Sequence, residues 1–134
     1  MIFLKKAKQG LIVFSIGAIG YGLIEIIWRG YTHWSMLCAG GMSFMGLSAI
    51  AERFKNLKLF FKAIIGGALI TAIEFVYGII FNVFLHKNVW DYSKMPFNLG
   101  GQICALYSFF WVALSFVALP FLKALNKMIK RNLG

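Results

Sequence analysis

Four carboxylates have the greatest potential for chemistry in this 134-residue chain: Glu25, Glu52, Glu74 and a single aspartate, Asp91. Glu74 lies near the middle of a long apolar stretch, where a charged side chain costs about 2.5–3.5 kcal/mol to insert into a bilayer. Such a residue is expected to face a helix bundle or a wet cavity rather than lipid. In that position a carboxylate can bind a cation or exchange a proton.

The residues around Glu74 predict one face of a helix. Steps of three or four residues connect it to Gly67, Thr71, Gly78 and Asn82, while Ile and Phe dominate the remaining surface. We interpret this stripe as a packing face, and Glu74, Thr71 and Asn82 as candidates for binding a substrate or an ion. A similar row in the last apolar stretch would meet it along a polar seam, although close packing alone also explains such rows. That row comprises Gly101, Cys104, Ser108, Trp111, Ser115 and Ala118.

Glu25 has two interpretations. Arg29 follows four residues later, in the acid-then-base order of a helical ion pair. Glu25 would instead assist Glu74 if the two carboxylates approach each other, because the pair would then share a proton or hold a cation. Glu52 adjoins Arg53 at the end of an apolar stretch, and we expect it to be solvated, within reach of water and basic neighbours.

The stretch HKNVWDYSKMPFNLGGQIC, residues 86–104, predicts a structured connector. Asp91 and Ser93 can bond to nearby backbone, and Asn98 can cap the following helix. Trp90 and Tyr92 suit either the headgroup level of a membrane or a lid over the polar seam. We therefore consider Trp90, Asp91, Tyr92, Ser93 and Asn98 as a gate at the outer entrance.

Other site chemistries have little support in the sequence. His33 and His86 lie in connectors without the pattern of a catalytic triad or a zinc site. Cys38 and Cys104 lie in or beside apolar helices without a C-x-x-C motif, so we expect buried, unpaired thiols. The sequence predicts no metal site and no cofactor.

These side chains belong to a chain that is 60% hydrophobic and 17% aromatic. Its apolar residues come in runs near the ~20 residues that cross a bilayer. We predict an all-α membrane protein with four transmembrane helices, at about residues 9–28, 34–51, 62–85 and 102–122, in one membrane domain covering 1–134. The amino-terminal run is too long for a cleaved signal and is predicted to be retained as the first helix.

The positive charge predicts how the helices are oriented. One side collects eleven of the fourteen Lys and Arg residues, and only Arg29, Lys87 and Lys94 fall on the other. The eleven are Lys5, Lys6, Lys8, Arg53, Lys55, Lys58, Lys62, Lys123, Lys127, Lys130 and Arg131. Both termini and the 51–62 connector are therefore expected in the cytoplasm, facing anionic lipid headgroups. Because these charges lie between apolar runs, the net charge of +10 does not indicate nucleic-acid binding.

Two segments of the chain share a short pattern. LIEIIW at 23–28 and AIEFVY at 72–77 each precede a Trp-containing connector and a Gly-Gly pair. The pattern predicts a parallel repeat of two helical hairpins, which would bring Glu25 and Glu74 near a shared interface. Chance similarity between two Ile-rich helices explains the matches equally well.

The residues from Glu74 to Trp111 resemble a known family. The matching set is Glu74, Gly78, Asn82, the W-D-Y-S motif at 90–93, Pro96, Asn98, Gly101, Ser108 and Trp111. It is similar to the bacterial four-helix membrane proteins named type IV ABC-transporter permeases. The resemblance implies a multi-pass protein of the bacterial plasma membrane and a permease subunit. The chain contains no G-x-x-x-x-G-K-[ST] loop, so any ATPase would be a separate subunit.

We expect a small transporter or permease-like subunit, in which the buried carboxylate binds a cation, a proton or a cationic substrate. Four helices enclose little volume, so a homo-oligomer or a partner membrane subunit is expected. One alternative is an intramembrane enzyme that acts on a lipid, using Glu74, Asp91 and either His86 or Ser93. Another is a scaffold subunit whose small-residue faces bind a membrane partner.

Overall fold

The computed structural model describes residues 2–133 and consists of four long helices joined by short connections. The helices are α1 (Ile2–Arg29), α2 (Trp34–Arg53), α3 (Leu59–Gly78) and α4 (Ala105–Leu133). A π-helical segment, η1 (Ile79–Phe84), continues α3. Each of the four is long and apolar enough to cross a membrane, with η1 extending the third, which confirms the predicted all-α membrane class.

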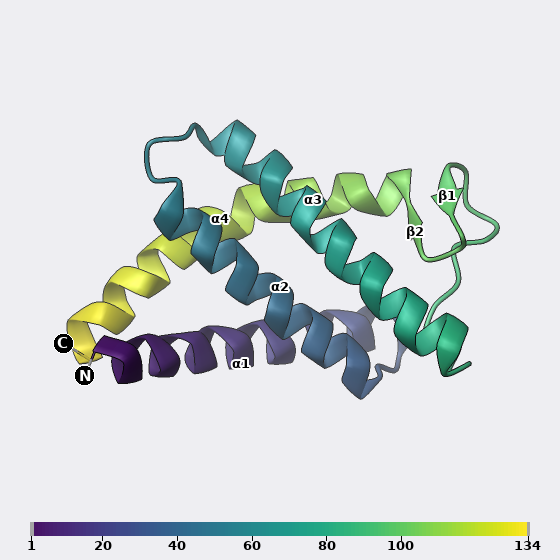
Figure 1. The fold of residues 1–134 in the computed structure, drawn as a ribbon, viewed down its shortest axis with the longest axis horizontal. Helices are drawn as coiled ribbons and strands as arrows, with labels where there is room; N and C mark the ends of the chain where they lie inside the picture. The colour runs from purple at the N-terminus through teal and green to yellow at the C-terminus, as the bar shows by residue number, and fades with distance from the viewer. Residues whose placement is uncertain (1, 134) are drawn as a thin grey trace.

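The helices form two hairpins that pack on each other. In Figure 1, α1 and α2 run antiparallel, and α3 crosses α2 before the chain returns along α4. The two termini lie close together at one end of the long axis, and the loop that precedes α4 lies at the opposite end. The 54–58 connector lies toward the end that holds the termini.

The small-residue stripe on α3 packs against α4, as the sequence predicts. A Cβ atom on Gly67 would overlap the side chain of Val112 and lie 3.0 Å from its backbone nitrogen. One turn later, the Thr71 hydroxyl donates a hydrogen bond of 3.0 Å to Ser108 Oγ. Gly67 therefore permits the close approach of the two helices that places Glu74 beside α4.

The fourth helix differs from the predicted span at both ends. It begins at Ala105 rather than near Gln102, because the residues before it pair as two short antiparallel strands, β1 (Asn98–Leu99) and β2 (Ile103–Cys104). Asn98 does not cap α4, which corrects the prediction. Its Oδ1 instead accepts a hydrogen bond of 3.0 Å from the backbone N–H of Gly101 and stabilises the turn between the strands.

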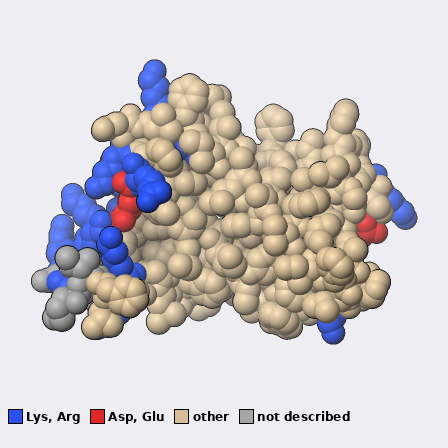
Figure 2. Space-filling model, in the orientation of Figure 1, with Lys and Arg blue, Asp and Glu red and all other residues tan. Residues whose placement is uncertain are grey.

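The carboxyl-terminal half of α4 changes the surroundings of Glu52. The carboxylate forms an ion pair of 2.6 Å with Lys130 and accepts a hydrogen bond of 3.2 Å from Gln9. Glu52 remains partly solvated, with 35% of its side chain exposed, and its basic neighbour is Lys130, because α4 continues far beyond Leu122 and brings Lys130 within reach. Figure 2 shows that these charges belong to a strongly basic end of the molecule, while the middle of the visible face lacks charge.

Candidate ligand-binding site

Glu74 is buried in the bundle, with 6% of its surface exposed. Its Oε1 accepts a hydrogen bond of 3.2 Å from the indole N–H of Trp111 on α4. Its Oε2 accepts one of 3.0 Å from the Tyr92 hydroxyl in the loop before α4. Both donors are neutral, and neither ion pair found in residues 2–133 includes Glu74.

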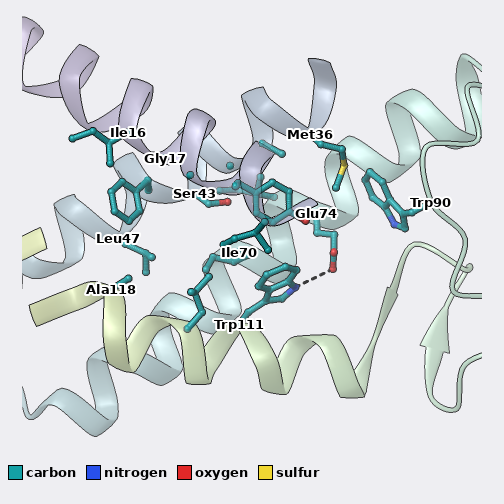
Figure 3. Close-up of a pocket in the computed structure, with 18 residues that line it drawn as sticks. Ile16, Gly17, Met36, Ser43, Leu47, Ile70, Glu74, Trp90, Trp111 and Ala118 are labelled. Atoms are coloured by element: carbon teal, nitrogen blue, oxygen red, sulfur yellow. Dashed lines mark hydrogen bonds between the residues drawn. The ribbon is translucent and has the colours of Figure 1, made fainter. Parts of the chain in front are cut away.

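Glu74 lies in the wall of a cavity of about 200 Å³, which we call the inner cavity. All four helices and the loop before α4 (residues 85–104) contribute to its lining, which is apolar and aromatic apart from Glu74 and the hydroxyl groups of Tyr21 and Ser43. Figure 3 shows the Glu74 carboxylate between the rings of Trp90 and Trp111, with the Trp111 nitrogen turned toward it. Tyr21 of α1 and Phe44 of α2 supply further rings.

A larger cavity of about 570 Å³, the lateral cavity, lies between α1 and α4. Its lining includes Glu25 and Arg29 of α1 and Phe110 of α4. The two cavities adjoin, because six residues line both of them. The shared residues are Tyr21, Ile24, Met36, Trp90, Trp111 and Leu114.

Glu25 and Arg29 form the ion pair that their spacing predicts, with 2.6 Å between Glu25 Oε2 and Arg29 Nε. Arg29 also donates a hydrogen bond of 2.9 Å to the backbone carbonyl of Val89 and lies over the ring of Tyr31. Glu25 therefore lines the lateral cavity as one half of a neutral pair, whereas Glu74 lines the inner cavity without a cationic partner.

A polar network holds the loop before α4 against η1, at the end of the third helix. Asn82 Oδ1 accepts a hydrogen bond of 2.7 Å from the Val89 backbone, and Asn82 Nδ2 donates one of 2.9 Å to Gln102 Oε1. The Trp90 indole N–H donates a hydrogen bond of 2.9 Å to the Gln102 carbonyl oxygen. This network places Trp90 in the walls of both cavities and directs Tyr92 toward Glu74.

Tyr92 is the direct link between the loop and the carboxylate. Its ring stacks on Tyr107 of α4, with 4.9 Å between the ring centroids. Burial of the phenol and the nearby charge of Glu74 raise the pKa of Tyr92 above its ordinary value near 10. The hydroxyl therefore keeps its proton and can donate it to Glu74 in a hydrogen bond at neutral pH.

The remaining residues of the predicted gate lie elsewhere. The Asp91 carboxylate accepts hydrogen bonds of 2.8 Å from the Ser93 backbone and 3.0 Å from its hydroxyl, and these bonds lower the pKa of Asp91. Asn98 belongs to the turn between the strands. Trp90 and Tyr92 reach the cavities, whereas Asp91, Ser93 and Asn98 are absent from both linings.

Thr71 and Asn82, predicted as binding residues, also line neither cavity. Thr71 is bonded to Gly67 and Ser108, and Asn82 is bonded to the loop. Sequence reasoning did not single out Tyr21 or Gln102. For Tyr21 the available signal was its position four residues before Glu25 on one helical face.

Within residues 2–133, no cluster of three or more His, Cys, Asp or Glu side chains could hold a metal ion. Cys38 and Cys104 are free thiols. The site is therefore built from one carboxylate, several aromatic rings and a neutral ion pair.

Residues 12–133 match the family described as "Putative ABC-transporter type IV". The chain belongs to this family. Membership confirms the resemblance carried by the residues from Glu74 to Trp111, and extends it over most of the chain. No curated protein and no solved structure is significantly similar to the chain. Together with its four apolar helices, membership makes this protein a multi-pass membrane protein of the ABC-transporter type.

Proposed function

We propose that this protein is a permease-like membrane subunit that binds a positively charged ligand at Glu74, in the inner cavity. The observation that carries the proposal is a buried carboxylate in a cavity wall, bonded only to the neutral donors of Tyr92 and Trp111. A charge in this position is costly unless a partner compensates it. A bound cation or a proton would provide that compensation.

Electrostatics and aromatic packing favour the same class of ligand. Two unit charges 4 Å apart attract each other by about 4 kcal/mol at an effective dielectric constant near 20. The faces of Trp and Tyr rings add about 0.5–2 kcal/mol for a desolvated cation. Tyr21, Trp90 and Trp111 all line the inner cavity with Glu74, so the site would attract a cation and offers little to an anion.

We also propose how the protein is oriented in its membrane and with which subunits it assembles. The charge bias supports a cytoplasmic location for both termini and the 54–58 connector. The resemblance to the bacterial family implies that the membrane is a bacterial plasma membrane. The loop before α4, with Tyr92 bonded to Glu74, would then face the outside. The family supports assembly with other subunits, and an ATPase would be one of them, because this chain carries no phosphate-binding loop.

Binding of benzyltrimethylammonium to the protein in lipid nanodiscs, measured by isothermal titration calorimetry, tests the proposal. We expect Glu74→Gln to weaken binding by about 10-fold or more, which corresponds to ~1.4 kcal/mol. Glu52→Gln is the matched control, because it removes a helical carboxylate that lines neither cavity. Equal binding by Glu74→Gln, in protein that retains the helical content of the wild type, would contradict the proposed function.

A further inference from the structure

The lateral cavity opens on the side of the helix bundle. Its lining includes Trp28, Phe110 and Val117, which are 78%, 52% and 72% exposed. All three belong to the long apolar helices α1 and α4. In a bilayer, surface at these positions faces lipid, so the cavity is accessible from within the membrane.

The lateral cavity also leads to Glu74. Tyr21, Trp90 and Trp111 line both cavities, and Trp111 donates its indole hydrogen bond to the carboxylate. A ligand whose charged group lies beside Glu74 would therefore have the space between α1 and α4 available for the rest of its structure.

The residues that line the two cavities limit the class of cation that can bind. Small hard cations such as Ca²⁺ and Mg²⁺ bind six or more oxygen atoms. Each Glu74 oxygen already accepts a hydrogen bond, and the described residues hold no group of three or more His, Cys, Asp or Glu side chains that could complete such a shell. Aromatic faces instead suit a large, weakly hydrated cation such as a quaternary ammonium group. The Glu25–Arg29 pair leaves the lateral cavity without net charge, which suits a hydrocarbon chain.

We propose that the ligand is an amphiphilic organic cation that reaches Glu74 from the bilayer, between α1 and α4. Its cationic headgroup lies in the inner cavity, and its hydrocarbon chain lies in the lateral cavity. This inference rests on the proposed function of Glu74 and adds the ligand class and the route of access.

A photoreactive probe tests the route. The probe is dodecyltrimethylammonium with a diazirine in the middle of its chain, and its neutral counterpart carries a tert-butyl group in place of the trimethylammonium group. After irradiation of the protein in nanodiscs, mass spectrometry maps the labelled residues. We expect the cationic probe to label Ile24, Phe110 or Val117 at least five-fold more than the neutral probe does. Excess benzyltrimethylammonium should remove that difference.

Two α4 variants separate the lateral cavity from the rest of the helix. Ala113 lines the lateral cavity, so Ala113→Trp should reduce labelling by the cationic probe at least five-fold. Ala124 is exposed on the same helix and lines neither cavity, so Ala124→Trp should label like the wild type. The Ala124→Trp result shows that a new tryptophan on α4 does not itself prevent labelling.

The outcomes distinguish this inference from the proposed function. Equal labelling of the lateral cavity by the two probes would overturn the inference, because the cavity would then hold apolar chains whatever their headgroup. Unchanged labelling in a folded Ala113→Trp variant would overturn it as well. If benzyltrimethylammonium binds through Glu74 in either case, the proposed function survives. If benzyltrimethylammonium does not bind at all, the proposed function itself fails.

Discussion

Tyr92 lies outside the apolar helices, but it bonds directly to Glu74 within them. The Tyr92 hydroxyl donates to Glu74 Oε2, although the two residues are separated by 18 positions in the chain. The loop thus covers the carboxylate and supplies one of its two hydrogen bonds. A ligand that uses both oxygens of Glu74 would have to compete with Tyr92 and with Trp111.

The raised pKa of Tyr92 gives a prediction for alkaline pH. Because burial and the charge of Glu74 disfavour the phenolate, Tyr92 should keep its proton at pH 11, where an ordinary tyrosine with a pKa near 10 is mostly ionised. We expect the absorbance change at 295 nm between pH 8 and 11 to be the same in the wild type and in Tyr92→Phe. After unfolding in denaturant, the absorbance change of the variant should be smaller than that of the wild type by the contribution of one tyrosine.

The same shift has a consequence for stability. A group whose pKa is raised by folding stabilises the folded state fully at pH values below its pKa in the unfolded chain. The folded state should therefore lose stability as the pH rises above about 10.

One absorbance result would contradict the placement of Tyr92 beside Glu74. A smaller absorbance change at 295 nm for folded Tyr92→Phe than for the folded wild type would show that Tyr92 ionises early.

Residue-scale prediction succeeded where one side chain conflicts with its surroundings. Glu74 is conspicuous because a carboxylate within an apolar run requires a polar environment, and its burial follows from that conflict. Tyr21 and Gln102 give no such signal. Tyrosine is ordinary in a membrane helix, and the role of Gln102 depends on a loop conformation that sequence spacing does not specify.

At the scale of elements, the contact between α3 and α4 depends on Gly67. A Cβ atom there would overlap Val112 and press on its backbone, which cannot rotate away. We expect Gly67→Ala to destabilise the protein by about 1–3 kcal/mol, the usual cost of overpacking. Thermal unfolding in a fixed detergent would show this as a lower Tm.

Gly20 supplies the matched control for this variant. It also lies within an apolar helix, but nothing lies within 4 Å of a Cβ atom added there. Since alanine favours helix over glycine by about 1 kcal/mol, Gly20→Ala should leave the Tm unchanged or raise it. Equal losses of Tm in both variants would indicate that replacing any helical glycine by alanine lowers stability, and would contradict the special role of Gly67.

The helices themselves were predictable from apolar runs, but their ends were not. The last span was expected to end at Leu122, whereas α4 continues to Leu133 because its later residues pack and pair at the basic end. The start of α4 was missed for a different reason. Gly100 and Gly101 adopt positive φ angles and turn the chain into a strand pair, so Asn98 cannot be the helix cap.

For the whole molecule, the distribution of charge predicts its orientation in the membrane. A cysteine-labelling experiment in intact bacterial cells checks this, in a background with Cys38→Ala and Cys104→Ala. Asn56 and Lys94 are exposed in the connectors at opposite ends of the molecule. With an impermeant maleimide, Lys94→Cys should be labelled in intact cells, and Asn56→Cys only after the membrane is opened. The reverse pattern would invert the orientation and place Tyr92 on the cytoplasmic side.

The central claim is that Glu74 gives the inner cavity a preference for positively charged ligands. A comparison of two ligands of nearly the same shape tests this claim most directly. Benzyltrimethylammonium and its neutral isostere neopentylbenzene have nearly the same shape, so their affinities for the protein in nanodiscs differ through charge. We predict that the wild type prefers the cation by about 10-fold or more, and that Glu74→Gln removes most of this preference. Equal affinities of the wild type for the two compounds, or a preference that survives in Glu74→Gln, would contradict the account.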